Sequence, residues 1–423
     1  MKAYDFLLRV RFGLHLSSKR RNDVLSFDMH DRIAPLLGFR DSKKFSGAER
    51  FMRYFYLKAN IVSDVTSHIS GLCTRHWILE GVRDWGIRKK KITSNFYEYK
   101  NVIILIGICS LSTNPDIIIE AFYAYSRSGR EFSPKLKEDI RKNLLLIGKK
   151  VRNSHVATGF FIDLLKGKRV YETLSEMNNA GVLGRFIPEF GALRSLVVYE
   201  PYHRYTVDEH TLHAIKNLEQ LTSSNYKALE RLSGIMNGIK DREMLYMSLL
   251  FHDIGKASGR HHEEQGYRLL KNIVERFNID IAKRQRIEFL VKNHVLMSRI
   301  ALARDIDDPE TIAHFAETVG DEDSLNALYL MTYGDMSAVN PDFWTEWKAY
   351  LLEELYSRTL NSLRGIKRDR EAYKKTILDS YAGGDKKGLE RFIAEMPERY
   401  LLSASPVRIS NDYGLVLAAR KED

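Results

Sequence analysis

The stretch Ser248-Leu249-Leu250-Phe251-His252-Asp253-Ile254-Gly255-Lys256 decides how this chain is interpreted. It places an imidazole and a carboxylate side by side at the end of an apolar run, with a lysine three residues further on. A carboxylate buried in apolar surroundings is costly unless a cation or another partner compensates its charge. We therefore interpret His252-Asp253 as the middle of a metal site.

The composition predicts a soluble globular protein with room for two or three domains, since 44% of its 423 residues are hydrophobic and 29% are charged. No apolar run approaches the roughly 18 residues of a membrane span, and the first residues do not resemble a signal peptide. We expect a cytoplasmic protein without a membrane partner. The net charge of +11 favours acidic partners, but the basic clusters lack the interleaved aromatics of a nucleic-acid platform, so we do not expect nucleic acid.

Long segments have apolar residues at helical spacing and prolines are few, which predicts an all-α fold. The glycine- and proline-rich run 181–191 is the best domain boundary. We expect one helical domain over residues 1–195, a second over 196–380, and a C-terminal helix and tail over 381–423. A short strand-turn-strand piece is expected around residues 407–417.

Other candidate ligands for the site lie before and after the central stretch. The run Thr206-Val207-Asp208-Glu209 has the spacing of a capping box, which places His210 in the first turns of a helix. Asp335 falls on the apolar stripe of a later helix and should face inward. Two imidazoles and two carboxylates, from His210, His252, Asp253 and Asp335, suit a divalent manganese, iron, magnesium or zinc ion better than a soft metal.

Three further residues extend this hypothesis. His262 and His294 are candidates for binding a second ion, with Asp253 as the bridge, although a histidine on an apolar face is often only a hydrogen-bonded core residue. Lys256 is placed to meet a phosphate oxygen, or is an ordinary surface lysine. Because a bound metal activates water and polarises phosphoryl oxygens, the expected reaction is phosphoester hydrolysis, with Asp253 and Lys256 in catalytic roles. The chain has no Gly-x-Ser-x-Gly, Walker or dinucleotide-binding glycine motif.

At these residues the chain resembles the HD superfamily of metal-dependent phosphohydrolases. The surrounding sequence narrows the resemblance to the bifunctional uridylyltransferase/uridylyl-removing enzymes. The runs that carry it in the second half are 202–210, 293–298, 304–309 and 344–348, and in the first half 7–15, 49–56 and 181–191.

The resemblance implies uridylyl removal, which is hydrolysis of the phosphodiester that joins UMP to a tyrosine of the PII signal protein in nitrogen regulation. It maps the family's metal ligands onto His210, His252, Asp253 and Asp335, and its additional histidines onto His262 and His294. The family's nucleotidyltransferase motifs and glutamine-binding ACT domains are not visible here, so residues 1–195 would be the helical linker that follows the transferase. We expect an excised middle portion rather than a reduced relative, and no uridylyl transfer; incorporation of UMP from UTP would contradict this.

Two alternatives stay open at the level of sequence. One is an HD hydrolase of nucleotides, such as guanosine polyphosphates or deoxynucleotides, which a small-molecule substrate screen would distinguish. Cyclic dinucleotides are less favoured, because Gln265-Gly266-Tyr267-Arg268 lacks the proline of that branch's Gly-Tyr-Pro signature. The other alternative is a non-catalytic regulatory scaffold, in which the HD fold senses nucleotide or binds PII or RNA; less than one bound ion per chain after manganese loading, or no loss of binding in Asp253→Ala, would favour it.

Overall fold

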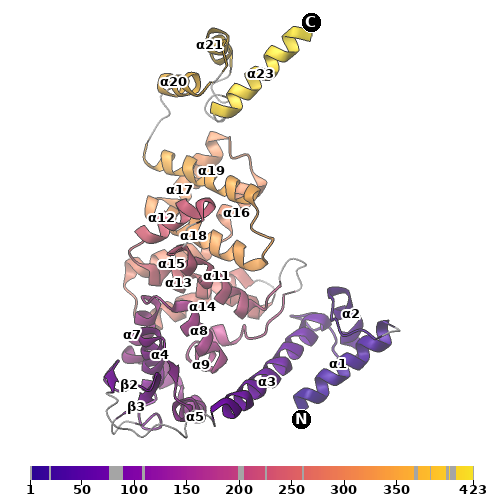
Figure 1. Ribbon diagram of the computed structural model, residues 1–423, viewed down its shortest axis with the longest axis vertical. Helices are drawn as coiled ribbons and strands as arrows, with labels where there is room; N and C mark the ends of the chain where they lie inside the picture. The colour runs from indigo at the N-terminus through magenta and orange to yellow at the C-terminus, as the bar shows by residue number, and fades with distance from the viewer. Residues whose placement is uncertain are drawn as a thin grey trace. The chain divides into compact units, whose positions relative to one another are not determined.

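The computed structural model describes residues 2–18, 21–75, 89–106, 110–198, 204–223, 226–259, 262–365, 370–381, 383–396, 400 and 406–422. The chain forms two compact units, the first with residues 1–294 and 333–344 and the second with residues 295–332 and 345–423. Helices predominate throughout, which confirms the predicted fold class (Figure 1). The domain bounds at 195 and 380 stay a prediction. In the part of the chain that the structure describes, no helix has the length and apolar character needed to cross a membrane.

The first three helices build a small core of their own. They are α1 (Lys2–Ser18), α2 (Phe27–Leu36) and α3 (Gly47–Arg75). Phe6, Val10 and Leu14 recur every four residues and so share one face of α1, where they pack with Ile33 of α2 and Phe51 of α3. The spacing of the apolar residues therefore fixes which face of each helix is buried.

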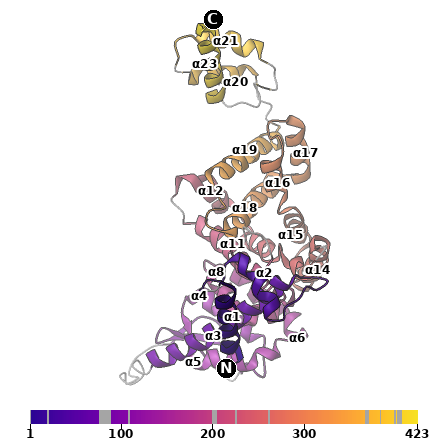
Figure 2. The same ribbon diagram turned by 90° about the vertical axis from the view of Figure 1, so that its right-hand side faces the viewer.

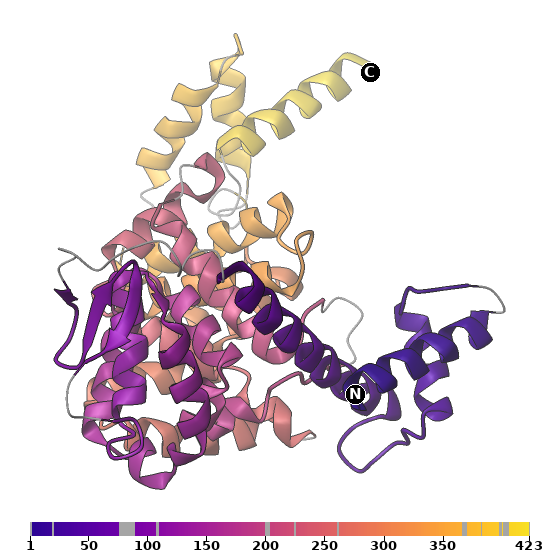
Figure 3. The same cartoon turned by 60° about the horizontal axis from the view of Figure 1, so that its bottom comes forward.

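A four-stranded sheet follows, which the sequence did not predict. Its strands are β1 (Lys90–Lys91), β2 (Phe96–Tyr99), β3 (Val102–Leu105) and β4 (Glu131–Phe132), in that spatial order. β2 and β3 are antiparallel, and the turn between them places Lys100 and Asn101 at φ angles of 49° and 62°, as a tight two-residue hairpin requires. Figure 3 shows the strands, in purple, with helices against one face of the sheet.

The helices of residues 117–191 follow β3 in sequence. They are α4 (Ile117–Ser128), α5 (Pro134–Asn143), the 3₁₀ turn η1 (Leu144–Leu146), α6 (Lys149–Arg152), α7 (His155–Leu165), α8 (Val170–Asn179), α9 (Val182–Phe186) and α10 (Pro188–Gly191). α4 packs on β2 and α5 on β3, whereas α7 and α8 pack on α4. The run predicted as a domain boundary forms α9 and α10, which cross so closely that a Cβ on Gly184 would lie 2.9 Å from the Cα of Gly191. Glycine is required at this crossing.

The next helices carry most of the predicted site. They are α11 (Val207–Leu221), η2 (Lys227–Leu229), α12 (Glu230–Gly238), α13 (Arg242–Phe251), η3 (Ile254–Ser258), α14 (His262–Arg276) and α15 (Ile281–Asn293). Residues 243–251 of α13 are all buried, so this helix is central, as its apolar sequence predicts.

The two halves of the first unit share one core. The rings of Phe161 in α7, Phe186 in α9 and Phe277, which directly follows α14, meet with centroids 5.5 to 5.8 Å apart. Beside them, Arg276 of α14 makes a two-pronged ion pair with Glu189 of α10, at 3.1 and 3.2 Å. The helices before and after residue 195 therefore stabilise one another.

The second unit consists of helices. They are α16 (Leu296–Ala303), α17 (Pro309–Val319), the first part of α18 (Glu322–Val339), α19 (Glu346–Leu363), α20 (Arg370–Ser380), α21 (Lys386–Glu395) and α23 (Pro406–Glu422). Residues 333–339 of α18 belong to the first unit. Tyr329 of α18 and Tyr356 of α19 stack with their ring centroids 4.9 Å apart.

The expected strand-turn-strand piece at 407–417 is wrong, because α23 covers these residues. Ile409, Tyr413 and Leu417 recur every four residues and face a cluster formed with α20 and α21, whereas Val407 and Leu415 are exposed. Figure 2 shows these three helices grouped together. The apolar residues on either side of Asn411-Asp412 follow a helical period, which outweighs the turn-like pair between them.

The aromatic cluster gives a test of the shared core. Phe277→Ala removes a ring that is 2% exposed and should lower the free energy of unfolding of the first unit by about 3 to 5 kcal/mol. Phe12→Ala, at a ring 64% exposed, is the matched control and should change it by less than about 0.5 kcal/mol. Urea unfolding followed by circular dichroism measures both. Equal losses in the two variants would contradict a shared core.

Candidate metal centre

The structure brings together the four residues predicted as metal ligands. His210 Nε2 lies 2.9 Å from Asp335 Oδ1, and His252 Nε2 lies 3.2 Å from Asp253 Oδ2 and 3.6 Å from Asp335 Oδ1. His210, His252 and Asp253 are buried, and the side chain of Asp335 is 21% exposed. The four side chains come from α11, the end of α13 and α18, and all belong to the first unit.

His210 is positioned by the beginning of α11. The helix begins at Val207, as predicted, and Thr206 has the extended backbone of an N-cap, but its side chain makes no capping bond. Asp208 provides a different anchor, since its carboxylate accepts hydrogen bonds from Ser195 N at 3.0 Å and from Asn178 Nδ2 at 3.4 Å. The predicted start of the helix is therefore correct, but the predicted capping bond of Thr206 is absent and Asp208 anchors this end of the helix instead.

His252 directly follows the last residue of α13, and a hydrogen bond to the backbone fixes the orientation of its ring. Nδ1 lies 2.7 Å from the carbonyl oxygen of Leu249, and since a carbonyl only accepts, Nδ1 carries the proton. In the neutral ring, Nε2 then presents a lone pair toward the two carboxylates. This atom is buried and makes no hydrogen bond. A metal ligand is commonly oriented by such a bond from its other ring nitrogen.

Asp335 reaches the site because α18 approaches α11 and α13 unusually closely. The residue before it is Gly334, where an added Cβ would lie 3.1 Å from Leu218 Cγ, 3.2 Å from Ala214 O and 3.3 Å from Leu249 Cδ1. α11 and α18 are also joined by a hydrogen bond of 2.8 Å, which Asn217 Nδ2 donates to Ser337 Oγ. Sequence reasoning missed both features, although a glycine in the middle of an apolar helical stripe is a signal of close packing.

The donor set fits a divalent cation. Ligands bound to one ion at about 2.1 Å lie roughly 3 Å from their neighbours, and the distances between 2.9 and 3.6 Å in this group are of that order. Donor atoms of His210, His252 and Asp253 all lie within 4.8 Å of one another. Imidazole and carboxylate without thiolate suit manganese, iron, magnesium or zinc.

The electrostatics of the site favour positive charge. Burial lowers the pKa of His252, but Asp253 and Asp335 outweigh it and raise that pKa to about 10. Burial raises the pKa of the Asp253 carboxyl, yet the charges of His252 and Lys256 hold it well below its usual range. The pKa of Asp335 is likewise held low against burial, by His210 and His252. Both carboxylates stay ionised, so a divalent cation would replace a proton of His252.

Lys256 lies beside the same carboxylate. The 3₁₀ turn η3 places its Nζ 2.8 Å from Asp253 Oδ2, and its side chain is 18% exposed. It is therefore no surface lysine, and its charge is directed into the site. Whether it meets a phosphate stays a prediction.

Of the two histidines predicted to bind a second ion, the structure describes the side chain of His294 but not that of His262. His294 follows α15, donates from Nδ1 to the Val291 carbonyl at 2.7 Å, and has its ring centroid 5.3 Å from that of His252. The backbone of His262 begins α14, but its side chain lies outside the described residues. His213, one turn after His210, lies tilted against Tyr205 with the ring centroids 4.4 Å apart, and it does not join the donor group.

Three family models match parts of this chain. Residues 207–331 match the HD domain family model, residues 1–70 the model described as GlnD PII-uridylyltransferase, and residues 96–186 the uridylyltransferase GlnD third domain. The match over residues 207–331 identifies an HD domain, which contains His210, His252, Asp253 and His294.

Curated relatives in two strains of Caulobacter vibrioides, each named bifunctional uridylyltransferase/uridylyl-removing enzyme, are 36% identical over 377 residues. The alignment covers 86% of this chain and 40% of each relative. The chain belongs to the family of these enzymes and spans about two fifths of the length of these relatives.

Among solved structures, the Thermotoga maritima CCA-adding enzyme complexed with tRNA aligns over 75% of this chain and 65% of its own, with a TM-score of 0.41 and 11% identity. A complex of a CCA-adding enzyme with CTP aligns over 77% and 64%, with a TM-score of 0.39 and 12% identity. These likenesses are too low to bear on function.

The close approach at Gly334 leads to a prediction about the site. Gly334→Ala should push α18 from α11 and α13, lower the free energy of unfolding by about 1 to 2 kcal/mol and weaken Mn²⁺ binding by roughly tenfold. Gly234→Ala in α12, where an added Cβ meets nothing within 4 Å, is the control and should be neutral or stabilising by up to about 1 kcal/mol. Thermal unfolding and calorimetric Mn²⁺ titration measure both effects. Unchanged Mn²⁺ affinity in Gly334→Ala would contradict this account.

Proposed function

We propose that the chain is a metal-dependent phosphodiesterase that removes UMP from uridylylated PII signal protein. The observation that carries the proposal is His252 Nε2, a buried nitrogen without a hydrogen bond that faces the ionised carboxylates of Asp253 and Asp335. His252 and Asp253 lie in the segment that matches the HD domain model. The relatives' name, which includes uridylyl removal, supports the substrate. The family model over residues 1–70, described as a PII-uridylyltransferase, supports PII as the partner.

The residues have separate tasks in this proposal. His210, His252, Asp253 and Asp335 would hold the ion, and His262 and His294 would hold a second ion if one binds. When bound, the ion would activate water and polarise a phosphoryl oxygen. Hydrolysis adds water across the bond between phosphorus and the tyrosine oxygen, so that this oxygen takes a proton and UMP leaves. The partly exposed side of Asp335 would admit the phosphodiester.

Lys256 would contact the substrate phosphate. Its ammonium lies 2.8 Å from Asp253 Oδ2 and is only partly exposed, so a phosphate placed at the ligands would come within its reach. A positive charge in a partly dry site stabilises the additional negative charge of a phosphoryl transition state. Asp253 would accept a hydrogen bond from the attacking water and so orient it.

Release of UMP tests the proposal directly. The chain with Mn²⁺ should release UMP from uridylylated PII, and Asp253→Asn should lower the rate at least about 100-fold, because it removes a ligand charge. Asp23→Asn is the matched control, at a carboxylate whose side chain is 48% exposed on the surface, and should keep full activity. Chromatography of released UMP measures the rate.

The two alternatives predict other results. Hydrolysis of guanosine polyphosphates or deoxynucleotides, with none of uridylylated PII while an intact relative cleaves it, would favour a nucleotide hydrolase. Less than one ion per chain after Mn²⁺ loading would favour a regulatory scaffold. Either result would contradict the proposal.

The role of Lys256 has its own prediction. Lys256→Met should lower kcat by roughly 100-fold while Mn²⁺ affinity stays equal or rises, because the substitution removes a cation that competes for Asp253. Steady-state kinetics and calorimetric Mn²⁺ titration separate these effects. A variant with normal kcat and weakened Mn²⁺ binding would show that Lys256 only supports Asp253.

A further inference from the structure

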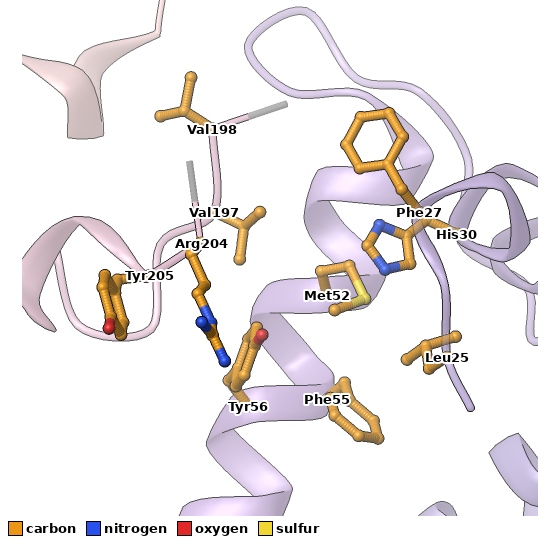
Figure 4. Close-up of a pocket in the computed structure, with 10 residues that line it drawn as sticks. All are labelled: Leu25, Phe27, His30, Met52, Phe55, Tyr56, Val197, Val198, Arg204 and Tyr205. Carbon is orange, nitrogen blue, oxygen red and sulfur yellow. The ribbon is translucent and has the colours of Figure 1, made fainter. Parts of the chain in front are cut away.

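A cavity of about 200 Å³ lies in the first unit (Figure 4). None of the four predicted metal ligands lines it. Three segments line it: the loop and first turn of α2, the N-terminal third of α3, and residues 197, 198, 204 and 205, which precede α11. Its lining residues are Leu25, Phe27, His30, Met52, Phe55, Tyr56, Val197, Val198, Arg204 and Tyr205.

The lining combines aromatic rings with a single charged side chain, and two of its members, Phe27 (43% exposed) and Arg204, are also exposed to solvent. Phe27, Phe55, Tyr56 and Tyr205 supply rings, and Arg204 is the only lysine, arginine or carboxylate residue among the ten. Burial lowers the pKa of His30 and raises the pKa of Tyr56, so the imidazole and the phenol both favour their neutral forms. Figure 4 shows the Arg204 side chain extending toward the wall formed by α3. The cavity therefore offers flat apolar surfaces and one guanidinium.

The volume limits the size of a ligand. A cavity of about 150 Å³ admits benzene, and pockets for drug-sized ligands begin near 300 Å³. At about 200 Å³, this cavity suits one ring with a small substituent, whereas a whole nucleotide would extend out of it into solvent. A guanidinium binds a carboxylate through paired hydrogen bonds, which matches a flat ring carrying a single carboxylate.

We propose that this cavity binds a single-ring planar carboxylate, with its ring among Phe27, Phe55 and Tyr56 and its carboxylate at Arg204, and that this ligand is an effector of the metal centre. None of the ten lining residues is among those assigned to the proposed phosphodiesterase reaction.

The connection to the metal centre runs through the segment that precedes α11. The ring of Tyr205 lies 4.4 Å from that of His213, one turn after His210 on α11. Arg204 N donates to the carbonyl of Val339 on α18, one turn after Asp335, at 3.2 Å. A ligand held by Arg204 and Tyr205 would therefore order residues attached to both helices that carry metal ligands. Coupling of this kind changes the affinity at each site by the same factor.

Calorimetry with the full chain tests binding, using benzoate and orotate as probes and benzamide as the uncharged match of benzoate. Benzoate should bind about tenfold or more tightly than benzamide, because one of its hydrogen-bond partners is charged. Arg204→Gln should remove this preference, whereas Arg9→Gln, at an exposed arginine of α1, should keep it. Val198→Trp, which fills the cavity from its half-buried wall, should abolish binding of all three probes.

Two further titrations complete the test. UMP, which would extend out of the cavity into solvent, should not displace benzoate, so a failure of the phosphodiesterase proposal leaves this one intact. Saturating benzoate should change Mn²⁺ affinity by several-fold, in the range of typical allosteric coupling. Equal affinity for benzoate and benzamide, or benzoate binding that survives Val198→Trp, would overturn the site. Mn²⁺ affinity that is the same with and without benzoate would overturn the effector role.

Discussion

Two carboxylates held among apolar helices are the constraint on which the first unit depends. Asp253 is 6% exposed and follows His252 at the end of the run Leu249-Leu250-Phe251, whose residues are at most 1% exposed. Charge in such surroundings is tolerated only when partners of opposite charge and hydrogen bonds replace its lost hydration. His252 and Lys256 provide part of this from the same segment.

The remaining compensation has to come from other helices. Asp335 adds a second negative charge, and its partner His210 lies 125 residues earlier in the chain. The charges therefore select one arrangement of α11, α13 and α18, whereas apolar packing alone would permit several. Gly334 makes this arrangement sterically possible, because its missing side chain lets α18 approach two helices at once.

The sequence allows the four residues that converge at the candidate metal centre to be predicted, but little of what positions them. His210, His252, Asp253 and Asp335 were predicted from apolar spacing, because a polar residue on a buried helical face needs an explanation. The close approach at Gly334 was missed, since it depends on which helix packs opposite. The short sheet was missed because β1 and β4 have two residues each, and no glycine marks the turn between β2 and β3. At residues 407–417, a two-residue turn signal was given more weight than the helical period of Ile409 and Tyr413.

His252 and His294 share a feature that bears on the number of ions. Each donates from Nδ1 to the carbonyl three residues before it, at 2.7 Å, and each follows directly on the last residue of a helix. The bond fixes the ring and leaves Nε2 as the potential ligand in both residues. Burial, followed by the charge of His252, lowers the pKa of His294, so this imidazole would bind a cation with no proton to lose. His294 is therefore already in the protonation state of a ligand, whereas His252 must first release a proton. A second ion would accordingly meet in His294 a ligand that is already oriented and already neutral.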